Sequence, residues 1–214
     1  MKQLNMNDVK IKALKTNSDL HVEKLTNVNA SGWEIAMVSD DFFDASRNTL
    51  KTINLNNNKL EVFPSIYQCS ILTVLKLNHN KITFVPEELA SVISLKTIDL
   101  SNNKIHTMSE EVYWLPKLES LDLGSNNINE IPPRIWNKTH VFCLNFSKNR
   151  EIISVPNDIL ADSKVHKLVL TDTSVDKKEL LDLPGMDNFT QRRKDRVDIA
   201  IWNDIGVNHD IWGL

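Results

Sequence analysis

The chain has 214 residues, of which 41% are hydrophobic and 25% are charged, and its formal net charge is −3. This length and apolar content suffice for one domain with its own core, so folding requires neither disulfides nor a metal. The small negative charge argues against a nucleic-acid or anionic-membrane partner, and the lack of any apolar run near ~18 residues argues against a membrane span.

Residues 1–49 predict an N-terminal cap. Leu20, Leu25 and Val28 have the spacing of a degenerate repeat. The Ser-Gly-Trp-Glu segment that begins at Ser31 has the pattern of a capping box, so a short helix is expected to start there. Such a cap would cover the apolar layer and the open strand edge at the end of a parallel stack.

Between residues 50 and 175 the chain repeats one pattern six times, Leu-x-x-Leu-x-Leu-x-x-Asn-x-Leu, followed by an apolar residue and Pro. Successive repeats are 22, 23, 23, 23 and 24 residues apart, and they begin at Leu50, Leu72, Leu95, Leu118, Val141 and Val165. The ninth position holds Asn58, Asn80, Asn103, Asn126, Asn149 and, in the last repeat, Thr173. A fixed period of this length indicates a solenoid.

Each repeat predicts the same small structure. Its x-Leu-x-Leu segment is expected to form a short strand whose alternate side chains point inward, so that strands of successive repeats pair in parallel. The chain must then turn sharply, and the Asn amide is suited to satisfy the backbone groups that the turn buries. The Pro fixes φ where the return segment begins. The sequence therefore predicts an α/β fold, a curved solenoid with a parallel sheet on its concave face.

Residues 176–214 predict a C-terminal cap and an apolar tail. Pro184 and Gly185 break the first segment, and a helix is expected from about Asp187. One side of this helix is interpreted as a solvated basic face made of Arg192, Arg193, Lys194 and Arg196. The tail beyond it, which includes Trp212, is expected either to cap the last repeat or to dock into another protein.

The repeats resemble, position by position, those of intracellular leucine-rich repeat proteins. The C-terminal part from Pro156 onward is also similar to the end of the leucine-rich-repeat-containing protein 57 family, through Lys178-x-x-Leu181-x-x-x-Gly185-x-Asp187-x-Phe189. The Ras-suppressor and Ras-scaffold repeat proteins are broader relatives of that family. This resemblance implies a small cytoplasmic adaptor whose partner is a small GTPase or a phosphatase subunit. Membrane anchoring is not expected, because Lys2 follows Met1 where N-myristoylation requires Gly.

The cysteine content predicts a cytoplasmic location. Extracellular leucine-rich repeat proteins usually carry Cys-rich caps, whereas this chain contains only Cys69 and Cys143. The first residues also lack the apolar stretch of a signal peptide. Both features favour a reducing compartment.

The concave face is the first candidate site for a protein partner. Side chains alternate along a strand, so positions three, five and seven of each repeat point away from the core. The residues expected to contact the partner are Lys76, Asn78, His79, Asp99, Ser101, Asp122 and Asn145. This face is polar and of mixed sign, and a solvated surface that binds nothing is the alternative interpretation.

Aromatic residues on the convex side are a second candidate. Tyr113, Trp114 and Trp136 occupy positions that the repeat does not reserve for the core, and stacking of adjacent repeats would gather them into one exposed patch. The alternative is that Trp136 folds sideways over its neighbour and is buried.

No catalytic site, cofactor or metal is expected. The six His residues have no metal-ligand spacing, and no phosphate loop or nucleophile elbow is present. Asp99 and Asp122 are expected side by side, but an open hydrated face gives no reason for their pKa values to separate. The sequence thus predicts a non-catalytic interaction module that binds a protein through its concave face. The alternative is a structural subunit of a large assembly, anchored through its C-terminal tail.

Overall fold

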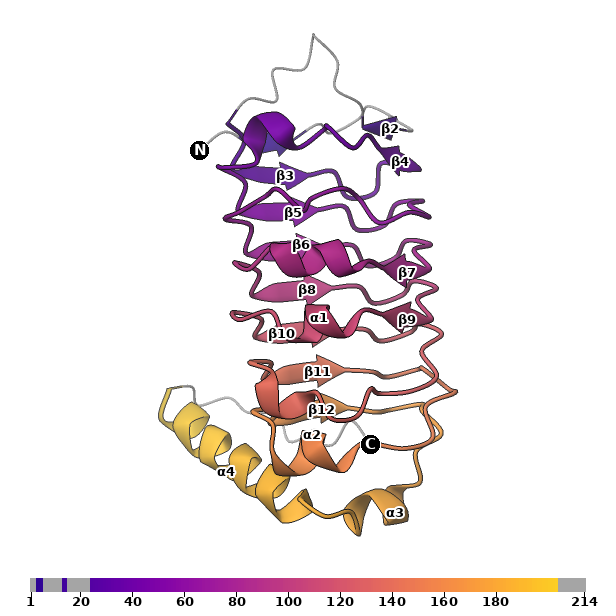
Figure 1. The fold of residues 1–214 in the computed structure, drawn as a ribbon, viewed down its shortest axis with the longest axis vertical. Helices are drawn as coiled ribbons and strands as arrows, with labels where there is room; N and C mark the ends of the chain where they lie inside the picture. The colour runs from indigo at the N-terminus through magenta and orange to yellow at the C-terminus, as the bar shows by residue number, and fades with distance from the viewer. Residues whose placement is uncertain (1–2, 6–12, 15–23, 204–214) are drawn as a thin grey trace.

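The computed structural model describes residues 3–5, 13–14 and 24–203. These residues form an elongated solenoid whose coils stack along the long axis of the molecule (Figure 1). In this described part, eight parallel strands make one sheet, in the order β1-β3-β5-β6-β8-β10-β11-β12. Their bounds are Gln3–Asn5, Asn27–Asn29, Thr52–Asn54, Val74–Lys76, Thr97–Asp99, Ser120–Asp122, Cys143–Asn145 and Lys167–Val169. The predicted α/β solenoid with a parallel sheet is confirmed.

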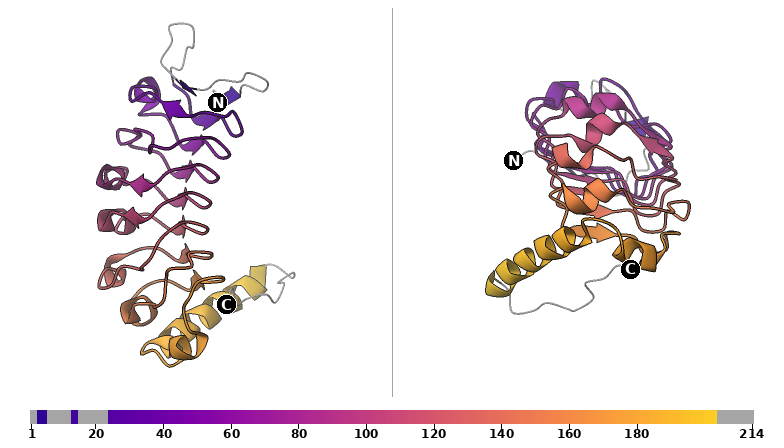
Figure 2. Two further views of the ribbon diagram at one scale, coloured as in Figure 1. Left: turned by 90° about the vertical axis from the view of Figure 1, so that its right-hand side faces the viewer. Right: turned by 60° about the horizontal axis from the view of Figure 1, so that its bottom comes forward.

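The return segments lie opposite the sheet and contain short helices (Figure 2). These are η1 (Asp44–Ser46), η2 (Glu87–Ser91), α1 (Glu110–Tyr113), η3 (Trp136–Lys138) and α2 (Asn157–Ala161). Two further pairs of short strands line the flank between the sheet and the return segments: β2 (Ala13–Leu14) with β4 (Met37–Val38), and β7 (Phe84–Val85) with β9 (Thr107–Met108). After the last strand the chain forms α3 (Lys177–Leu181) and α4 (Met186–Asn203).

The register of the sheet aligns equivalent positions of neighbouring repeats. Ile53 pairs with Leu75, Leu75 with Ile98, and Ile98 with Leu121. These inward side chains are at most 1% exposed, so they form one continuous apolar column. A single repeat could not bury such side chains alone, which is why the repeats are stable only when they are stacked.

The asparagine at the ninth position joins each repeat to the preceding one. Asn103 is representative: its Nδ2 donates to the Leu100 carbonyl at 2.9 Å within its own repeat and to the Leu77 carbonyl at 3.0 Å in the repeat before. Its Oδ1 accepts from the Ile82 N–H, also in the repeat before, at 3.0 Å. The same set of contacts recurs at Asn58, Asn80, Asn126 and Asn149. This asparagine ladder satisfies backbone groups that the core would otherwise leave without partners.

The ladder ends at Thr173. Its Oγ1 donates to the Leu170 carbonyl of its own repeat at 2.7 Å. A threonine side chain carries no N–H group and is shorter than asparagine, so it cannot make the second donation that reaches the preceding repeat. The last repeat is joined there by its backbone, through the Ser174 N–H and the Ile152 carbonyl at 2.9 Å.

The residue before each ladder position has a left-handed backbone. In all six repeats φ lies between 53° and 60°, at Asn57, His79, Asn102, Ser125, Lys148 and Asp172. This conformation is tolerated best by Gly, Asn and Asp. It makes the sharp turn that carries the chain from the strand to the inward-pointing asparagine.

The helix predicted to begin at Ser31 is wrong. The chain makes a turn there, with φ of 78° at Gly32, and continues into β4. The N–H groups of Trp33 and Ile35 instead donate to Asn58 Oδ1, at 3.1 and 2.9 Å. The ladder asparagine Asn58 therefore holds this segment in a turn on the next coil, in place of the predicted helix.

The sheet continues through the predicted N-terminal cap. Leu25 and Val28 are buried, and β3 pairs in parallel with β5 on one side and with β1 on the other. Leu20 lies outside the described residues. This segment thus forms a further coil of the solenoid, with the 3-10 helix η1 in its return segment.

The C-terminal helix α4 packs on α2 at the end of the stack (Figures 1 and 2). Phe189 is buried in this contact. The close approach requires Gly185, because a Cβ there would lie 2.6 Å from the Ala161 backbone and because φ is 91°. Beyond its contact with α2, the helix projects away from the coils. The predicted apolar tail with Trp212 lies outside the described residues.

The prediction that the basic face of α4 is wholly solvated is wrong at Arg192. Its guanidinium donates to the carbonyls at the end of α2, to Ala161 at 3.3 Å and also to Leu160, and its Nε donates to the Val165 carbonyl at 3.0 Å. The last carbonyls of a helix have no partner within the helix and carry partial negative charge, so they attract a cation. Arg193 is also half-buried, with its Cζ 5.8 Å from the Phe189 ring centroid. Lys194 is exposed, as the interpretation required, and the side chain of Arg196 lies outside the described residues. Among the described helices, none is both long and apolar enough to cross a bilayer.

Replacing a ladder asparagine should destabilise the fold strongly. In Asn126→Ala, the Ile105 N–H loses its partner inside the core. The Leu100 and Leu123 carbonyls each lose one of two donors and keep the other, from Asn103 and Asn149. We expect the free energy of unfolding to fall by about 2–4 kcal/mol in urea titrations. Asn127→Ala is the matched control, because that side chain is exposed, and it should change stability by less than ~0.5 kcal/mol. Equal effects of the two substitutions would contradict the role of the ladder.

Arg192→Ala should loosen the C-terminal end of the stack. The carbonyls of α2 and Val165 would lose charge-assisted hydrogen bonds, and we expect a loss of about 1–2 kcal/mol in thermal or urea unfolding. Lys194→Ala, which removes an exposed cation from the same helix, should be neutral. A neutral Arg192→Ala would show that the guanidinium contributes nothing to docking α4.

Candidate binding surface on the concave face

The last residues of four central strands form a continuous polar row. Lys76 of β6, Asp99 of β8, Asp122 of β10 and Asn145 of β11 are successive partners in the parallel register. Lys76 is exposed and the other three are half-buried. The structure therefore places the two aspartates on neighbouring strands, as the alternation of side chains predicted.

Asp99 is held by side chains of two coils. Its Oδ1 accepts from the Ser101 hydroxyl at 2.8 Å and from the Ser101 N–H at 3.1 Å. Its Oδ2 accepts from Asn78 Nδ2 in the preceding coil. The carboxylate consequently has a fixed orientation on the face of the sheet.

Asp122 has an equivalent arrangement with the following coil. Its Oδ1 accepts from the Gly124 N–H at 2.9 Å and from Asn145 Nδ2 at 3.0 Å. A Cβ at Gly124 would lie 2.9 Å from both Asn145 Nδ2 and Ser147 Oγ, so a larger residue would displace these side chains and disturb the network. The sequence placed Gly124 on this face but gave no signal of the close approach.

The fold does not require a charge at this position of the strand. Asn145 Oδ1 accepts from the Ser147 N–H at 2.9 Å, and Asn54 Oδ1 accepts from the Asn56 N–H at 3.1 Å. These are the same turn contacts that Asp99 and Asp122 make. Either Asp or Asn satisfies the turn, and the two central repeats nevertheless carry carboxylates.

The predicted concave residues thus lie together. Six of them form the row and its adjacent turns, and we call this set the concave row: Lys76, Asn78, Asp99, Ser101, Asp122 and Asn145. His79 is exposed at the left-handed turn that follows β6. A binding role for these residues stays a prediction.

The expected aromatic patch on the convex side is wrong. Trp136 and Tyr113 are 0% and 2% exposed, and their rings meet edge to face with centroids 5.2 Å apart. Trp136 Nε1 donates to the Pro132 carbonyl at 2.7 Å. Trp114 is half-buried under Lys138, whose Nζ is 5.2 Å from the ring centroid. The aromatic side chains fill space between adjacent return segments, which is the alternative that the sequence left open.

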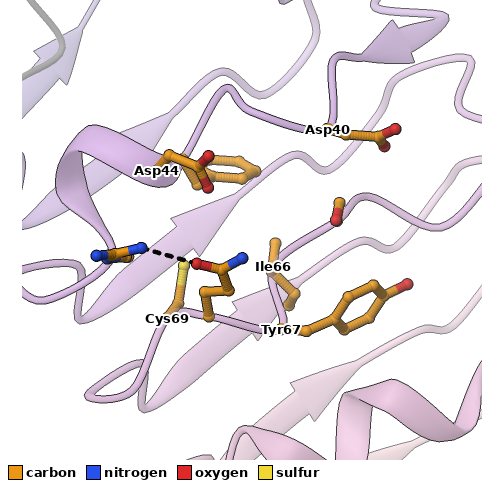
Figure 3. A pocket seen from close by; sticks show the side chains of 9 residues that line it. Asp40, Asp44, Ile66, Tyr67 and Cys69 are labelled. Carbon is orange, nitrogen blue, oxygen red and sulfur yellow. Dashed lines mark hydrogen bonds between the residues drawn. The ribbon is translucent and has the colours of Figure 1, made fainter.

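A shallow hollow of about 230 Å³, open to solvent, lies on the convex side. Figure 3 shows its lining, in which Asp40 and Asp44 lie on one coil and Ile66, Tyr67 and Cys69 on the next. Burial, with a further contribution from Asp44, raises the pKa of Cys69 to about 11. This thiol is therefore protonated at neutral pH and is a poor nucleophile. In the described part of the chain, no three His, Cys, Asp or Glu side chains converge as metal ligands.

The two cysteines should react at different rates. Near pH 8 a thiol reagent is expected to modify the half-buried Cys143 at least ~10-fold faster than the buried Cys69, because the thiolate is the reactive form. Single Cys→Ala variants assign the two phases. Since the folded pKa of Cys69 exceeds its ordinary value of 9.0, its contribution to stability is present below pH 9.0 and is lost as pH rises through about 11. Fast modification of Cys69 in the folded protein would contradict this assignment.

Comparison with known proteins identifies the repeats. The family model described as leucine rich repeat matches residues 49–105, 70–128 and 93–150. No curated protein sequence matches the chain significantly.

Three solved structures illustrate the similarity of fold. The leucine-rich repeat domain of APL1 has a TM-score of 0.71 at 19% identity and covers 82% of this chain and 46% of its own. A leucine-rich repeat protein of Leptospira interrogans has a TM-score of 0.64 at 23% identity, covering 78% and 47%. A chain of the Drosophila Toll–Spatzle complex has a TM-score of 0.65 at 22% identity, covering 78% and 24%.

The present chain spans less than half the length of each of these structures. At such identities the likeness concerns the fold alone. The repeat match, the asparagine ladder and the parallel sheet agree, and this chain is a leucine-rich repeat protein.

Proposed function

We propose that this chain is a non-catalytic interaction module of the adaptor or scaffold type, which binds a protein partner through the concave row. The supporting observation is the pair of carboxylates at Asp99 and Asp122. The turns at this position form equally well with Asn54 and Asn145, so the two negative charges are not explained by the fold. Repeat solenoids generally use such concave surfaces for binding.

The concave row favours a partner with complementary charges. Two half-buried carboxylates on adjacent strands would attract a basic side chain of the partner, and Lys76 beside them would attract an acidic one. Arg is the most suitable basic residue, because its planar guanidinium can donate to two carboxylates together. Charges arranged in this way mainly determine specificity and the rate of association.

We also propose a cytoplasmic location, from the positions of the two cysteines. Cys69 is buried on the convex side, whereas Cys143 lies in β11 on the concave face. Two thiols so placed cannot form a disulfide with each other. This supports the cytoplasmic location in our proposal. The Toll–Spatzle structure is itself a complex, and we place the present chain in the same broad class of leucine-rich repeat proteins that bind protein ligands.

Neutralising the two carboxylates should remove partner binding without unfolding the protein. In Asp99→Asn/Asp122→Asn, the turn hydrogen bonds remain possible, as they are at Asn54 and Asn145. We expect affinity purification from the native cell with quantitative mass spectrometry to show at least ~10-fold loss of the specific partners. Urea unfolding should show that the variant retains its stability.

The matched control is Glu130→Gln/Glu151→Gln, which removes two exposed charges away from the concave row. It should retain all partners that the unmodified chain captures. Unchanged capture by the aspartate variant, with both variants folded, would exclude the concave row as the binding site.

A further inference from the structure

An exposed apolar stripe runs along the flank of the solenoid, separate from the concave row. Three consecutive coils place a large apolar residue at the thirteenth position of the repeat: Met37 in β4, Val62, and Phe84 in β7. Their exposed fractions are 51%, 79% and 51%. Single exposed apolar residues are common on protein surfaces, but adjacent ones that form a stripe typically mark an interface.

Backbone hydrogen bonds keep these coils in register along the flank. The Lys59 N–H donates to the Ile35 carbonyl at 2.7 Å, and the Lys81 N–H donates to the Leu60 carbonyl at 2.8 Å. Met37, Val62 and Phe84 each lie two residues after the inward-pointing residue of their coil, so they are stacked one above another. Figure 1 shows β4 and β7 along the same side of the molecule.

Opposite charges border the flank at and beyond the Phe84 end of the stripe. On the side of the sheet, the tenth position is basic and exposed in three coils, at Lys59, Lys81 and Lys104. On the side of the return segments, exposed acidic residues begin η2 and α1, at Glu87, Glu88, Glu110 and Glu111. In the coil of Phe84 the surface is therefore basic, apolar and acidic in succession across the flank, and the next coil repeats the two charged borders around Thr107.

The lysines remain available for further contacts. Lys59 pairs with Glu34 at 3.3 Å and Lys81 with Glu61 at 3.4 Å, and all four side chains are 48% or more exposed. Such pairs contribute little to stability and exchange readily. A second carboxylate could approach either ammonium group from the solvent side.

A surface of this kind is complementary to itself. When two copies are related by a two-fold axis parallel to the stripe, each coil faces the same coil of the other copy and the two borders exchange sides. Lys81 then faces Glu87 and Glu88 of the second copy, Lys104 faces Glu110 and Glu111, and Phe84 lies against its symmetry mate. A two-fold axis perpendicular to the stripe would instead set like charges against each other.

We propose that this flank is the interface of a homodimer in which two solenoids lie side by side and parallel, with Phe84 at the two-fold axis. The occupant of the stripe is thus a second copy of this chain. The proposal is independent of the concave row, which both copies would leave open to other partners. Closed two-fold symmetry is the commonest arrangement of homo-oligomers.

The size of the surface sets the expected affinity. Six residues of extended chain separate the two charged borders, about 20 Å, and three coils span about 10–15 Å along the stack. The contact is therefore smaller than the ~800 Å² per partner of a standard interface. One pairing is also unfavourable, because Glu34 would face Asp40 of the second copy. We expect a weak dimer, with Kd of about 10–100 μM at low salt, that dissociates further as salt screens the charged borders.

Sedimentation equilibrium on the full chain between about 1 and 200 μM tests the proposal. The average mass should rise from that of the monomer toward that of the dimer, and Phe84→Lys should weaken association at least ~10-fold. Ile153→Lys is the matched control, because Ile153 occupies the same position of the fifth repeat and is 69% exposed. It should associate as the unmodified chain does.

A charge exchange tests the predicted orientation. Lys81→Glu should weaken association at least ~5-fold, and the combination Lys81→Glu/Glu87→Lys/Glu88→Lys should restore it, since the exchanged charges face one another again. An unmodified chain that stays monomeric at 200 μM would overturn the proposal. So would a Phe84→Lys variant, shown to be folded by circular dichroism, that dimerises normally.

Discussion

The structure depends on the hydrogen bonds of the asparagine ladder. A 23-residue coil is too short to bury the backbone groups of its own turn, and the neighbouring coil offers no regular secondary structure at that point. A buried Asn side chain solves both problems, because one amide both donates and accepts. Asn103 shows this clearly, since its contacts divide between its own repeat and the one before it. The apolar column supplies the driving force for stacking, and the ladder fixes its register.

The same constraint shapes the concave face. The left-handed residue that precedes each ladder position turns the chain inward just after the strand, and in four coils the last strand residue satisfies the N–H two residues on. Asp99, Asp122 and Asn145 all do so with a side-chain oxygen. After Lys76, the Asn78 N–H donates to Asn56 Oδ1 of the preceding coil instead. The need of these turns for an acceptor thus produces a row of oriented polar groups. Choosing Asp rather than Asn in the central repeats adds charge to that row without changing the fold.

The sequence predicts most of the solenoid and part of the candidate site. The strands, their register and the adjacent Asp99 and Asp122 follow from period and alternation, since each strand residue can point only inward or outward. The packing between return segments cannot be predicted from the repeat pattern, because the pattern does not specify how the Trp136 side chain packs against the adjacent coil. The helix predicted from Ser31 is wrong for a related reason, a contact with another coil. Its local capping signal is overridden by Asn58, a partner supplied by the next coil.

Native-state hydrogen exchange, resolved by NMR, tests most directly whether the ladder couples the coils into one cooperative unit. The amides of Leu60, Ile82, Ile105 and Ile128 all donate to ladder asparagines. If the ladder couples the coils, these four amides should exchange with one common free energy, close to that of global unfolding. Ser174, beyond the end of the ladder, should exchange through local opening at lower free energy. Independent exchange of the four amides, coil by coil, or protection of Ser174 equal to theirs would contradict the account.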